Sequence, residues 1–363
     1  MKTRHSIYFR LSVFLVSALL AVASVHLVLF LLRPPSSTKV FKEVLIPEGA
    51  SFRAVATQLR QEGIITDKET FIALGRLLGI TKKIRAGFYS LNTGMRPLDV
   101  LDYIKKGRII EYQVVLPEGV TIDNVASILE GVGLADKSQF LAKATDPAYV
   151  RSLGLEGDTL EGYLFPATYY LPKGITLDGI IKRMASKYRE IFNEDLKARA
   201  AALGMTEREV VVLASLIEKE AYLDSERMLI SAVFHNRIKK GMALQCDSTI
   251  IYALQRRGGW NGDLTKTEMR MKNPYNSYLN KGLPPGPIAN PGKPSMIAAL
   301  YPANVDYIFF VSKNDGTHYF SSNFKDHNRA VQEYQVMAKM QNISSAEGPW
   351  KNKPSVPEPP KTR

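Results

Sequence analysis

The chain opens with an apolar stretch long enough to cross a membrane as a helix. The 22 residues Leu11–Leu32 include no Asp, Glu, Lys or Arg, and about 20 apolar residues suffice for a helix to span a bilayer. Lys2, Arg4 and Arg10 precede the run, and basic flanks of this kind stay on the cytoplasmic side. The pattern therefore predicts a cytoplasmic segment at residues 1–10, a transmembrane anchor at 11–32, and the rest of the chain beyond the membrane.

A cleaved signal peptide is the alternative interpretation of this stretch, because Ala21-Val-Ala23 resembles a cleavage site. The apolar run continues for nine residues past Ala23, however, and a signal peptide does not need that extension. The length of the run therefore favours an uncleaved, single-pass anchor.

Beyond the anchor, one pattern of apolar and polar positions occurs three times. Val44–Leu59 (VLIPEGASFRAVATQL) recurs seventy positions later as Val114–Leu129 (VVLPEGVTIDNVASIL), and more faintly as Leu171–Ile181 (LPKGITLDGII). Each copy predicts a short strand, a Pro-x-Gly turn, a Ser or Thr N-cap and a helix with apolar residues three and four apart. The chain therefore contains an internal structural repeat.

The first copy continues into a longer unit. Phe71–Leu78 predicts a second helix and Gly87–Leu91 a second strand. This strand-helix-helix-strand order resembles a LysM-like carbohydrate-binding module, which we expect at residues 40–112. A small α+β unit that only supports the next domain is the alternative. The second copy and the linking part of the chain are expected at residues 113–200.

The next pattern predicts a buried helix that ends in a carboxyl group. Thr206-Glu-Arg-Glu209 has the spacing of a capping box, and Val210–Ile217 is apolar on every side of a helix apart from Ser215. Glu218 follows at the far end. An apolar setting disfavours the charged form of a carboxyl and raises its pKa toward the range of a general acid. Glu218 is therefore the candidate catalytic acid, whereas Glu220 lies about 200° further round the helix.

The remaining patterns complete an α+β fold, with a mixed α/β catalytic domain expected at residues 201–342. The segment 273–294 holds six prolines and three glycines, which predicts an extended loop. The other expected elements are a helix from Ser225 to Gly241, strands at 307–311 and 318–321 that form a C-terminal hairpin around Asn314-Asp-Gly316, a last helix at 328–340 and a disordered tail at 343–363.

Polar side chains gather at positions of this domain that a core does not favour. Gln245, Asp247 and Thr249 alternate along the chain, so in an extended segment they face one way. Amide, hydroxyl and phenol groups suit a sugar-binding cleft, in which amides bind hydroxyl and N-acetyl groups and aromatic rings lie against pyranose faces. For each residue, a hydrogen bond to nearby backbone is the alternative. The candidate substrate-binding residues are Gln245, Asp247, Thr249, Tyr252, Asn276, Ser277, Tyr278 and Glu220.

The charge of the chain narrows the classes of partner. With 48 Lys and Arg against 35 Asp and Glu, its formal charge is +13, which favours an anionic partner. A nucleic acid is not expected, because the sequence contains no recognisable binding module and begins with a membrane anchor. An acidic cell-surface polymer or lipid headgroups fit better. The five histidines are scattered, so we expect no metal site and no cofactor.

Six motifs of the second half of the chain follow one another in a specific order. They are Ala214-Ser-Leu-Ile-Glu-Lys-Glu-Ala221, Val233-Phe-His-Asn-Arg237, Leu244-Gln-x-Asp-x-Thr249, Asn276-Ser-Tyr278, Gly282-Leu-Pro-Pro-Gly-Pro-Ile-Ala-Asn-Pro-Gly292 and Asp315-Gly-Thr-His318. This order resembles the YceG-like family, the endolytic murein transglycosylases. The resemblance covers about residues 40–340, and the predicted anchor agrees with it.

The resemblance implies a reaction in which Glu218 is the essential carboxyl. Such an enzyme cleaves the β-1,4 bond between N-acetylmuramic acid and N-acetylglucosamine without water. Glu218 would first give a proton to the glycosidic oxygen and then take one from the muramyl C6 hydroxyl, which leaves a 1,6-anhydro end. The resemblance also implies a bacterial inner-membrane protein with its catalytic domain in the periplasm. Its expected partners are peptidoglycan glycan strands, the membrane and peptidoglycan synthases.

Two other functions, a muramidase and a glycan-binding scaffold, would give Glu218 and its neighbours different roles. A hydrolysing muramidase needs a second carboxylate about 5–10 Å from the first, which Asp247 or Glu226 could supply. A non-catalytic, glycan-binding scaffold of cell-wall synthesis would not need Glu218 for its function. Glu218 would then be a buried structural carboxyl paired with Arg237 or Lys219.

Two departures from the family pattern are visible. Cys246 and Ser248 stand where Thr and Pro are expected, and we expect both to point away from the cleft. Ala167 stands where Asp is usual after Phe165-Pro166, so no second charged group is assigned there.

Overall fold

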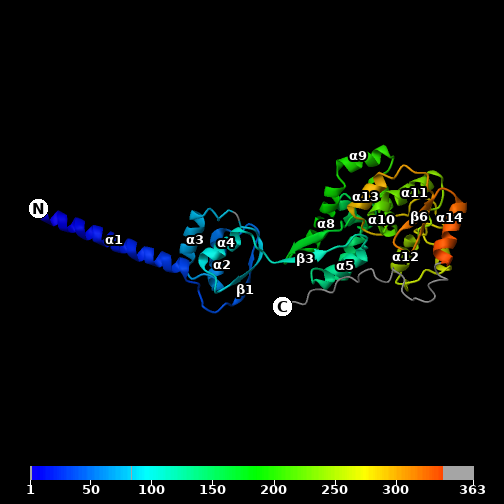
Figure 1. Cartoon of the computed structure of the whole chain (residues 1–363). Helices are drawn as coiled ribbons and strands as arrows, with labels where there is room; N and C mark the ends of the chain where they lie inside the picture. Colours follow the sequence, from blue (N-terminus) through cyan, green and yellow to red (C-terminus); the bar gives the residue numbers. More distant parts are fainter. Residues whose placement is uncertain (1, 83, 338–363) are drawn as a thin grey trace. The chain divides into compact units, whose positions relative to one another are not determined.

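The computed structural model describes residues 2–82 and 84–337 and divides the chain into two compact units (Figure 1). Unit 1 holds the chain up to Tyr112 together with Tyr170–Ile175, and unit 2 holds Gln113–Tyr169 and the chain from Thr176 on. The paired strands β3 (Glu111–Val115) and β4 (Thr168–Pro172) each cross the boundary between the units. The predicted tail at 343–363 and the end of the predicted last helix at 338–340 lie outside the described residues.

The first helix of unit 1, α1 (Lys2–Leu32), contains the apolar stretch noted in the sequence. Its segment Phe9–Leu32 has a mean hydropathy of 2.6 and is long and apolar enough to cross a membrane. Most of its side chains are exposed, but Phe30 is buried against the core of unit 1. A membrane would cover the exposed apolar surface.

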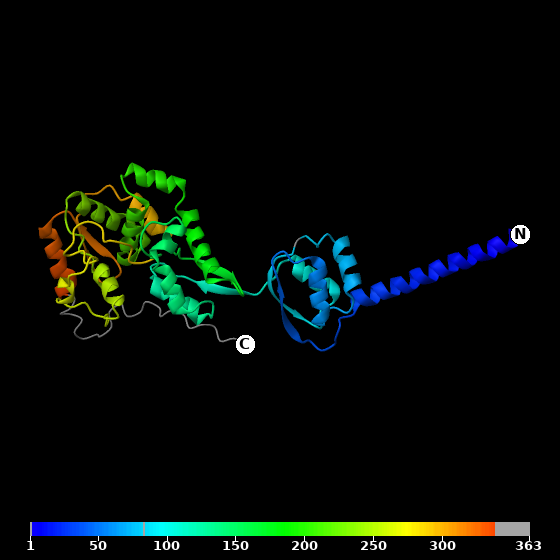
Figure 2. The same ribbon diagram turned by 180° about the vertical axis from the view of Figure 1, so that it is seen from behind.

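Unit 1 also contains a strand-helix-helix-strand arrangement followed by one more helix. The strands β1 (Phe41–Ile46) and β2 (Gly87–Asn92) pair antiparallel, from Phe41 opposite Asn92 to Ile46 opposite Gly87. One face of this pair is buried, and the helices lie together beside it (Figure 2). The helices are α2 (Phe52–Gln61), α3 (Lys68–Leu77) and α4 (Pro97–Lys105).

The local structure predicted for the three repeat copies is confirmed. In each copy a strand leads through a turn to a capped helix, and the N-cap side chain accepts a hydrogen bond from the backbone N–H three residues on. The caps are Ser51, Thr121 and Thr176. The turn glycines Gly49, Gly119 and Gly174 all have φ between +73° and +81°, a left-handed conformation that favours glycine.

In unit 2, the helix α10 (Glu207–Glu220) lies at the centre of the packing. Thr206 and Glu209 form the predicted capping box, and every residue from Val210 to Glu218 is buried. Helices α13 and α11 pack closely against it (Figure 1). The helices of unit 2 up to residue 300 are α5 (Ile122–Gly131), α6 (Lys137–Ala144), α7 (Pro147–Ser152), α8 (Leu177–Ile191), α9 (Glu194–Ala202), α10, η1 (Asp224–Glu226), α11 (Arg227–Lys239), α12 (Asp247–Gln255), η2 (Glu268–Arg270) and α13 (Lys293–Leu300).

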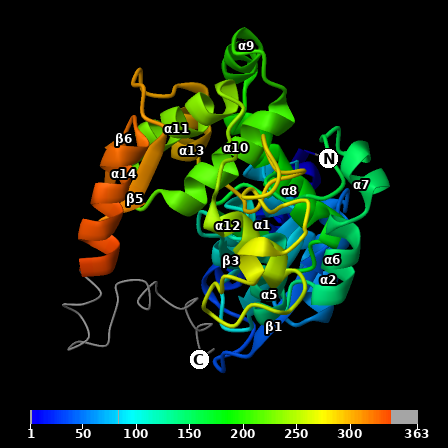
Figure 3. The same cartoon turned by 90° about the vertical axis from the view of Figure 1, so that its right-hand side faces the viewer.

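The last described elements of unit 2 are two strands and a helix that packs beside them (Figure 3). The strand β5 (Phe309–Ser312) pairs antiparallel with β6 (His318–Ser321). Helix α14 (Phe324–Val331) begins after Asn323, whose side chain accepts a hydrogen bond from the backbone N–H of Asp326. It continues as a π-helical segment, η3 (Gln332–Met337). The described part of the predicted last helix therefore starts four residues earlier than expected.

Two helices occupy segments for which the sequence predicted extended chain. The expectation that residues 244–249 are extended is wrong for their second half, because α12 begins at Asp247, and an acidic residue is favourable in the first turn of a helix. Helix α13 begins at Lys293, inside the predicted loop 273–294. Pro294 lies in its first turn, where the missing N–H of proline costs nothing.

Candidate active site

Helix α10 places Glu218 where three hydrogen-bond donors meet. Its Oε2 accepts hydrogen bonds from Arg227 Nη1 (3.1 Å), Gly292 N (3.0 Å) and Ser295 Oγ (2.8 Å). Arg227 begins α11, whereas Gly292 and Ser295 lie at the start of α13, so three helix ends converge on one carboxylate. The side chains of Glu218 and Arg227 are only 6% and 8% exposed. The site is therefore a nearly buried ion pair.

The partner of Glu218 was not found from the sequence. The sequence suggests Arg237 and Lys219 as partners, whereas the structure shows an ion pair between Glu218 and Arg227. Arg237 instead donates hydrogen bonds to the backbone oxygens of Ile308, Ala243 and Leu244. Arg227 stands nine residues after Glu218, beyond the end of the helix, and no local pattern links the two.

The guanidinium of Arg227 faces two further carboxylates. Its Nε donates to Asp224 Oδ1 at 2.8 Å, and its Nη2 lies 3.8 Å from Glu118 Oε2. Glu118 belongs to the Pro-x-Gly turn of the second repeat copy. Partial burial raises the pKa of Glu118 above its usual range, and the negative charge of Glu218 adds to the shift. Three carboxylates therefore surround one guanidinium.

Four of the predicted substrate-binding residues line one cavity of about 490 Å³: Glu220, Gln245, Asp247 and Tyr278. Its lining also includes Lys219, Arg237, His318 and Phe310. The Tyr278 hydroxyl donates to Asp247 Oδ1 at 2.6 Å, and Gln245 Oε1 accepts from Arg237 Nη1 at 3.2 Å. Gln245 has φ +52°, an unusual conformation for a residue other than glycine. The cavity thus combines amide, phenol, carboxylate and cationic groups.

Glu220 lies at the edge between this cavity and the protein interior. Its Oε1 accepts a hydrogen bond from the thiol of Cys246 at 3.0 Å. Burial raises the pKa of Glu220, and it raises the pKa of the Cys246 thiol as well. Neither Cys246 nor Ser248 is among the residues that line the cavity. Cys246 nevertheless affects the site, because it contacts one of the lining carboxyls.

The other four predicted binding residues, Thr249, Tyr252, Asn276 and Ser277, are buried and do not line the cavity. The hydroxyls of Thr249 and Ser277 bond each other at 2.9 Å, and Asn276 Nδ2 donates to the carbonyls of Met269 and Met271. These side chains have almost no exposed surface to offer a ligand, in contrast with the expectation. For Thr249 the reason is the start of α12 at Asp247, because its hydroxyl then donates to the Cys246 carbonyl at 2.7 Å.

Tyr252 belongs to a separate buried network around Glu161. Its hydroxyl donates to Glu161 Oε2 at 3.1 Å, while Glu161 Oε1 accepts from Ile122 N at 3.0 Å and Asn290 Nδ2 at 3.3 Å. Burial raises the pKa of Glu161 to about 8. This carboxyl therefore joins three segments of unit 2 away from any cavity described above.

The two residues considered as a second catalytic carboxylate have other partners. Glu226 accepts from the backbone N–H of His318 at 3.0 Å and pairs with its Nδ1 at 2.7 Å, and Asp247 is bonded to Tyr278. Within the described residues, no group of three or more His, Cys, Asp or Glu side chains is arranged to hold a metal ion.

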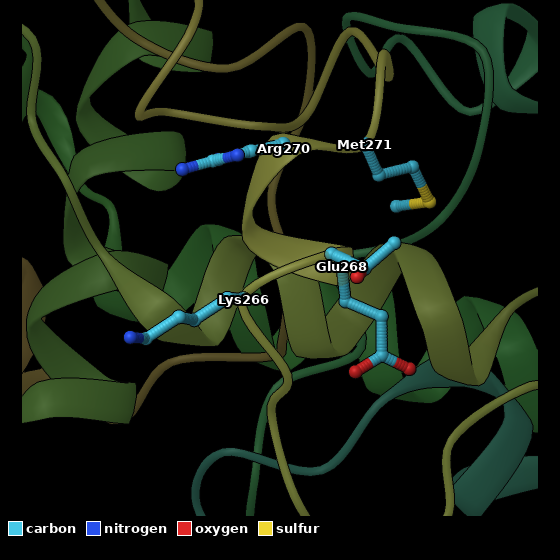
Figure 4. Close-up of a pocket in the computed structure, with 5 residues that line it drawn as sticks. Lys266, Glu268, Arg270 and Met271 are labelled. Atoms are coloured by element: carbon cyan, nitrogen blue, oxygen red, sulfur yellow. The ribbon is translucent and has the colours of Figure 1, made fainter.

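A larger cavity of about 610 Å³ lies around η2 (Figure 4). It is lined by Lys266, Thr267, Glu268, Arg270 and Met271. None of the predicted site residues lines it. Its connection to the site is indirect, through the carbonyl of Met271, which accepts a hydrogen bond from Asn276.

Comparisons with known proteins give one consistent result. Residues 44–333 match the model of the YceG-like family. The chain is 33% identical over 316 residues to the endolytic murein transglycosylase of Bacillus subtilis strain 168. This match covers 82% of this chain and 86% of that protein. It is 30% identical over 332 residues to the endolytic murein transglycosylase of Streptococcus pneumoniae strain R6 and spans 59% of that protein's length.

A solved structure agrees with these sequence relatives. The crystal structure of a YceG-like protein from Listeria monocytogenes matches with a TM-score of 0.55 and 32% sequence identity. The match covers 80% of this chain and 99% of the Listeria chain. At this identity, the mixed α/β fold and the family are shared.

Proposed function

Because the chain belongs to the YceG-like family, we propose that it is an endolytic lytic transglycosylase of peptidoglycan. It cleaves the β-1,4 bond between N-acetylmuramic acid and N-acetylglucosamine within a glycan strand and uses no water. The observation that carries the proposal at the level of residues is the convergence of Arg227, Gly292 and Ser295 on Glu218. A carboxyl fixed in this way, with little solvent around it, suits proton transfer to a bound sugar.

In the proposed mechanism Glu218 acts as acid and then as base. All three donors reach Oε2, so the mechanism assigns the proton exchange to Oε1. The proton passes to the glycosidic oxygen as the bond from that oxygen to the muramyl C1 breaks. The C6 hydroxyl then attacks C1 and gives its proton to Glu218. The product ends in 1,6-anhydro-N-acetylmuramic acid, and the carboxyl returns to its starting form.

The cavity beside the end of α10 is the proposed glycan-binding cleft. Glu220, Gln245, Asp247 and Tyr278 line it, and their polar groups match the hydroxyl and N-acetyl groups of the sugar. Lys219 and Arg237 bring positive charge to the same cavity, which suits the acidic lactyl or stem-peptide groups of peptidoglycan. Thr249 and Ser277 support this cleft from the interior: their hydroxyls bond each other, and the Ser277 carbonyl accepts a hydrogen bond from the backbone N–H of Gln245.

The proposal includes a LysM-like module at residues 40–112 that binds glycan. The order β1-α2-α3-β2, with the two strands antiparallel, supports it. Residues 113–200 then form the linking part and 201–342 the catalytic domain. Loss of strand binding on deletion of residues 40–112, with cleavage of short strands retained, is the expected result. Unchanged strand binding would leave the module a purely structural role.

We place the chain in the bacterial inner membrane, with residues 1–10 in the cytoplasm, a single transmembrane anchor and the catalytic domain in the periplasm. The apolar segment Phe9–Leu32 supports this arrangement. The intact mass of the chain from membranes tests it, because a signal peptide would leave a product that starts after Ala23. An anchored enzyme of this kind lies beside the synthases that make its substrate, so co-purification with a peptidoglycan synthase is expected.

The proposed activity is tested on purified, uncross-linked glycan strands with the full-length chain in detergent micelles. Mass spectrometry is expected to show internal fragments that end in anhydromuramic acid and that disappear for Glu218→Gln. Fragments heavier by one water, with reducing ends, would instead identify a muramidase. Strands that are bound but left intact by the unaltered chain would identify a glycan-binding scaffold.

A further inference from the structure

The turn that carries Glu118 is held firmly against the start of α13. The backbone N–H of Gly119 donates to the Asn290 carbonyl at 2.9 Å, and the N–H of Asn290 donates to the Val120 carbonyl at 2.8 Å. The Asn290 side chain adds a bond to the same Val120 oxygen at 2.9 Å. Lys219 Nζ donates to the Gly119 carbonyl at 3.3 Å. These hydrogen bonds therefore fix the backbone of the turn that carries Glu118.

Glu118 and Glu218 share the same two neighbours. The Glu118 carboxylate lies so close to Gly292 that a Cβ at this position would collide with it. The N–H of Gly292 donates to Glu218. Arg227 faces both carboxylates, at 3.1 Å for Glu218 and 3.8 Å for Glu118. The two carboxyl groups thus lie on either side of one glycine and one guanidinium.

The charges around this pair do not balance when every group is ionised. Arg227 from α11 faces the carboxylates of Glu118, Glu218 and Asp224, so three negative charges meet one guanidinium. Neighbouring carboxylates relieve their repulsion when one of them binds a proton. Glu218 is stabilised as an anion by three hydrogen bonds, whereas Glu118 has only the longer contact. The raised pKa of Glu118 agrees with this distribution.

We propose that Glu118 is a positioning residue of the transglycosylase reaction. Its carboxyl forms a pair with the carboxyl of Glu218, and this pair holds one proton at neutral pH. The inference rests on the proposed function of Glu218. The pair supplies the proton that goes to the glycosidic oxygen when its bond to C1 breaks. It regains one proton from the C6 hydroxyl when the new bond from O6 to C1 forms, so no water and no other proton donor is needed. Glu118 acts through Glu218 and need not touch the sugar.

The internal repeat provides a matched control. Glu48 occupies the same position in the first copy, in the turn Pro47-Glu48-Gly49, and it is exposed. In the third copy the position holds Lys173. The copy beside Glu218 is the second one, so Glu118→Gln and Glu48→Gln make the same chemical change in the same kind of turn.

The test is the pH dependence of strand cleavage by the full-length chain between about pH 4.5 and 8.5. Glu118→Gln removes the carboxyl that holds the proton of the pair at neutral pH. Fewer molecules therefore carry the reactive proton at neutral pH. For Glu118→Gln we expect about a tenfold loss of kcat at pH 7.5, with recovery toward the unaltered rate near pH 5, which is a shift of about one unit in the basic limb. Glu48→Gln is expected to keep the unaltered pH profile.

A second variant, Gly292→Ala, keeps the Glu118 carboxyl but changes its position. Gly292 has φ −75°, which alanine adopts without strain, so Gly292→Ala is expected to displace the Glu118 carboxylate and shift the basic limb in the same direction. Superimposable pH profiles for Glu118→Gln and the unaltered chain would overturn the inference. An equal loss of rate at every pH would also overturn it, since that result indicates a structural role. Absence of anhydro products from the unaltered chain would contradict the proposed function itself.

Discussion

Replacing Arg227 by methionine tests whether the buried ion pair with Glu218 exists in solution. Methionine fills most of the space of the arginine stem but carries no charge. The side chains of Arg227 and Glu218 are 8% and 6% exposed. Removal of one partner from a pair buried to this degree costs about 3–5 kcal/mol of unfolding free energy, because the other charge is left without compensation.

The other two ion pairs of Arg227 add little to this figure. The side chains of Asp224 and Glu118 are 78% and 44% exposed, and solvent-exposed ion pairs contribute at most about 1 kcal/mol. Most of the cost should therefore disappear when Glu218 is made neutral. In the Glu218→Gln background we expect the effect of Arg227→Met to be smaller by about 2–3 kcal/mol, the upper part of the usual range of coupling for groups in direct contact.

The assay is urea unfolding of the full-length chain in detergent micelles, followed by tryptophan fluorescence. The two tryptophans of the chain, Trp260 and Trp350, both lie outside unit 1, so the signal does not come from unit 1. Four proteins complete the cycle: the unaltered chain, each single variant and the double variant. Equal costs of Arg227→Met in both backgrounds, or a cost well below 1 kcal/mol in the unaltered one, would refute the buried pair.

Three further predictions concern other parts of unit 2. Gln245→Gly is expected to raise the unfolding free energy by about 1 kcal/mol, because φ +52° suits glycine, and to raise the KM for glycan strands; a lower urea midpoint would contradict the backbone argument. Thr206→Ala is expected to lower the unfolding free energy by about 1 kcal/mol through loss of the capping box of α10, and an unchanged urea midpoint would argue against that role. The folded-state pKa of Glu161, about 8, lies above the unfolded value, so this carboxyl stabilises the fold fully below the unfolded pKa, and the contribution is lost as the pH rises through 8. Glu161→Gln should therefore lose less stability than the unaltered chain between pH 5 and pH 8.5, as measured by urea unfolding, and parallel losses would contradict the shift.

Elements with local signals were predictable from the sequence. The capping box at Thr206 and the caps at Ser51, Thr121 and Thr176 depend on contacts within four residues, and all four are present. The burial of Glu218 followed from the apolar run before it. These features need no knowledge of tertiary packing.

The features that were missed depend on contacts between distant segments. Arg227 pairs with Glu218 because α10, α11 and α13 converge, and Glu118 reaches the same place from 100 residues earlier in the chain. The period-two pattern from Gln245 to Thr249 was misleading, because a helix starts in its middle. Thr249, which is fully buried in the first turn of that helix, was therefore expected to bind substrate. A sequence pattern within one segment does not predict which helix ends lie together in the folded chain.

If the chain is anchored in a membrane as proposed, its division into two units determines where a protease can release the enzyme. Residues 170–175 belong to unit 1, although they are flanked on both sides by chain that belongs to unit 2. There the backbone N–H of Lys173 donates to the Ile110 carbonyl at 2.9 Å, and its side chain pairs with Glu43. A protease that cuts between Tyr112 and Gln113 would leave the second fragment inserted in the first through this segment. Shedding of the catalytic part would require a cut before β1, between residues 33 and 40, which would detach both units together.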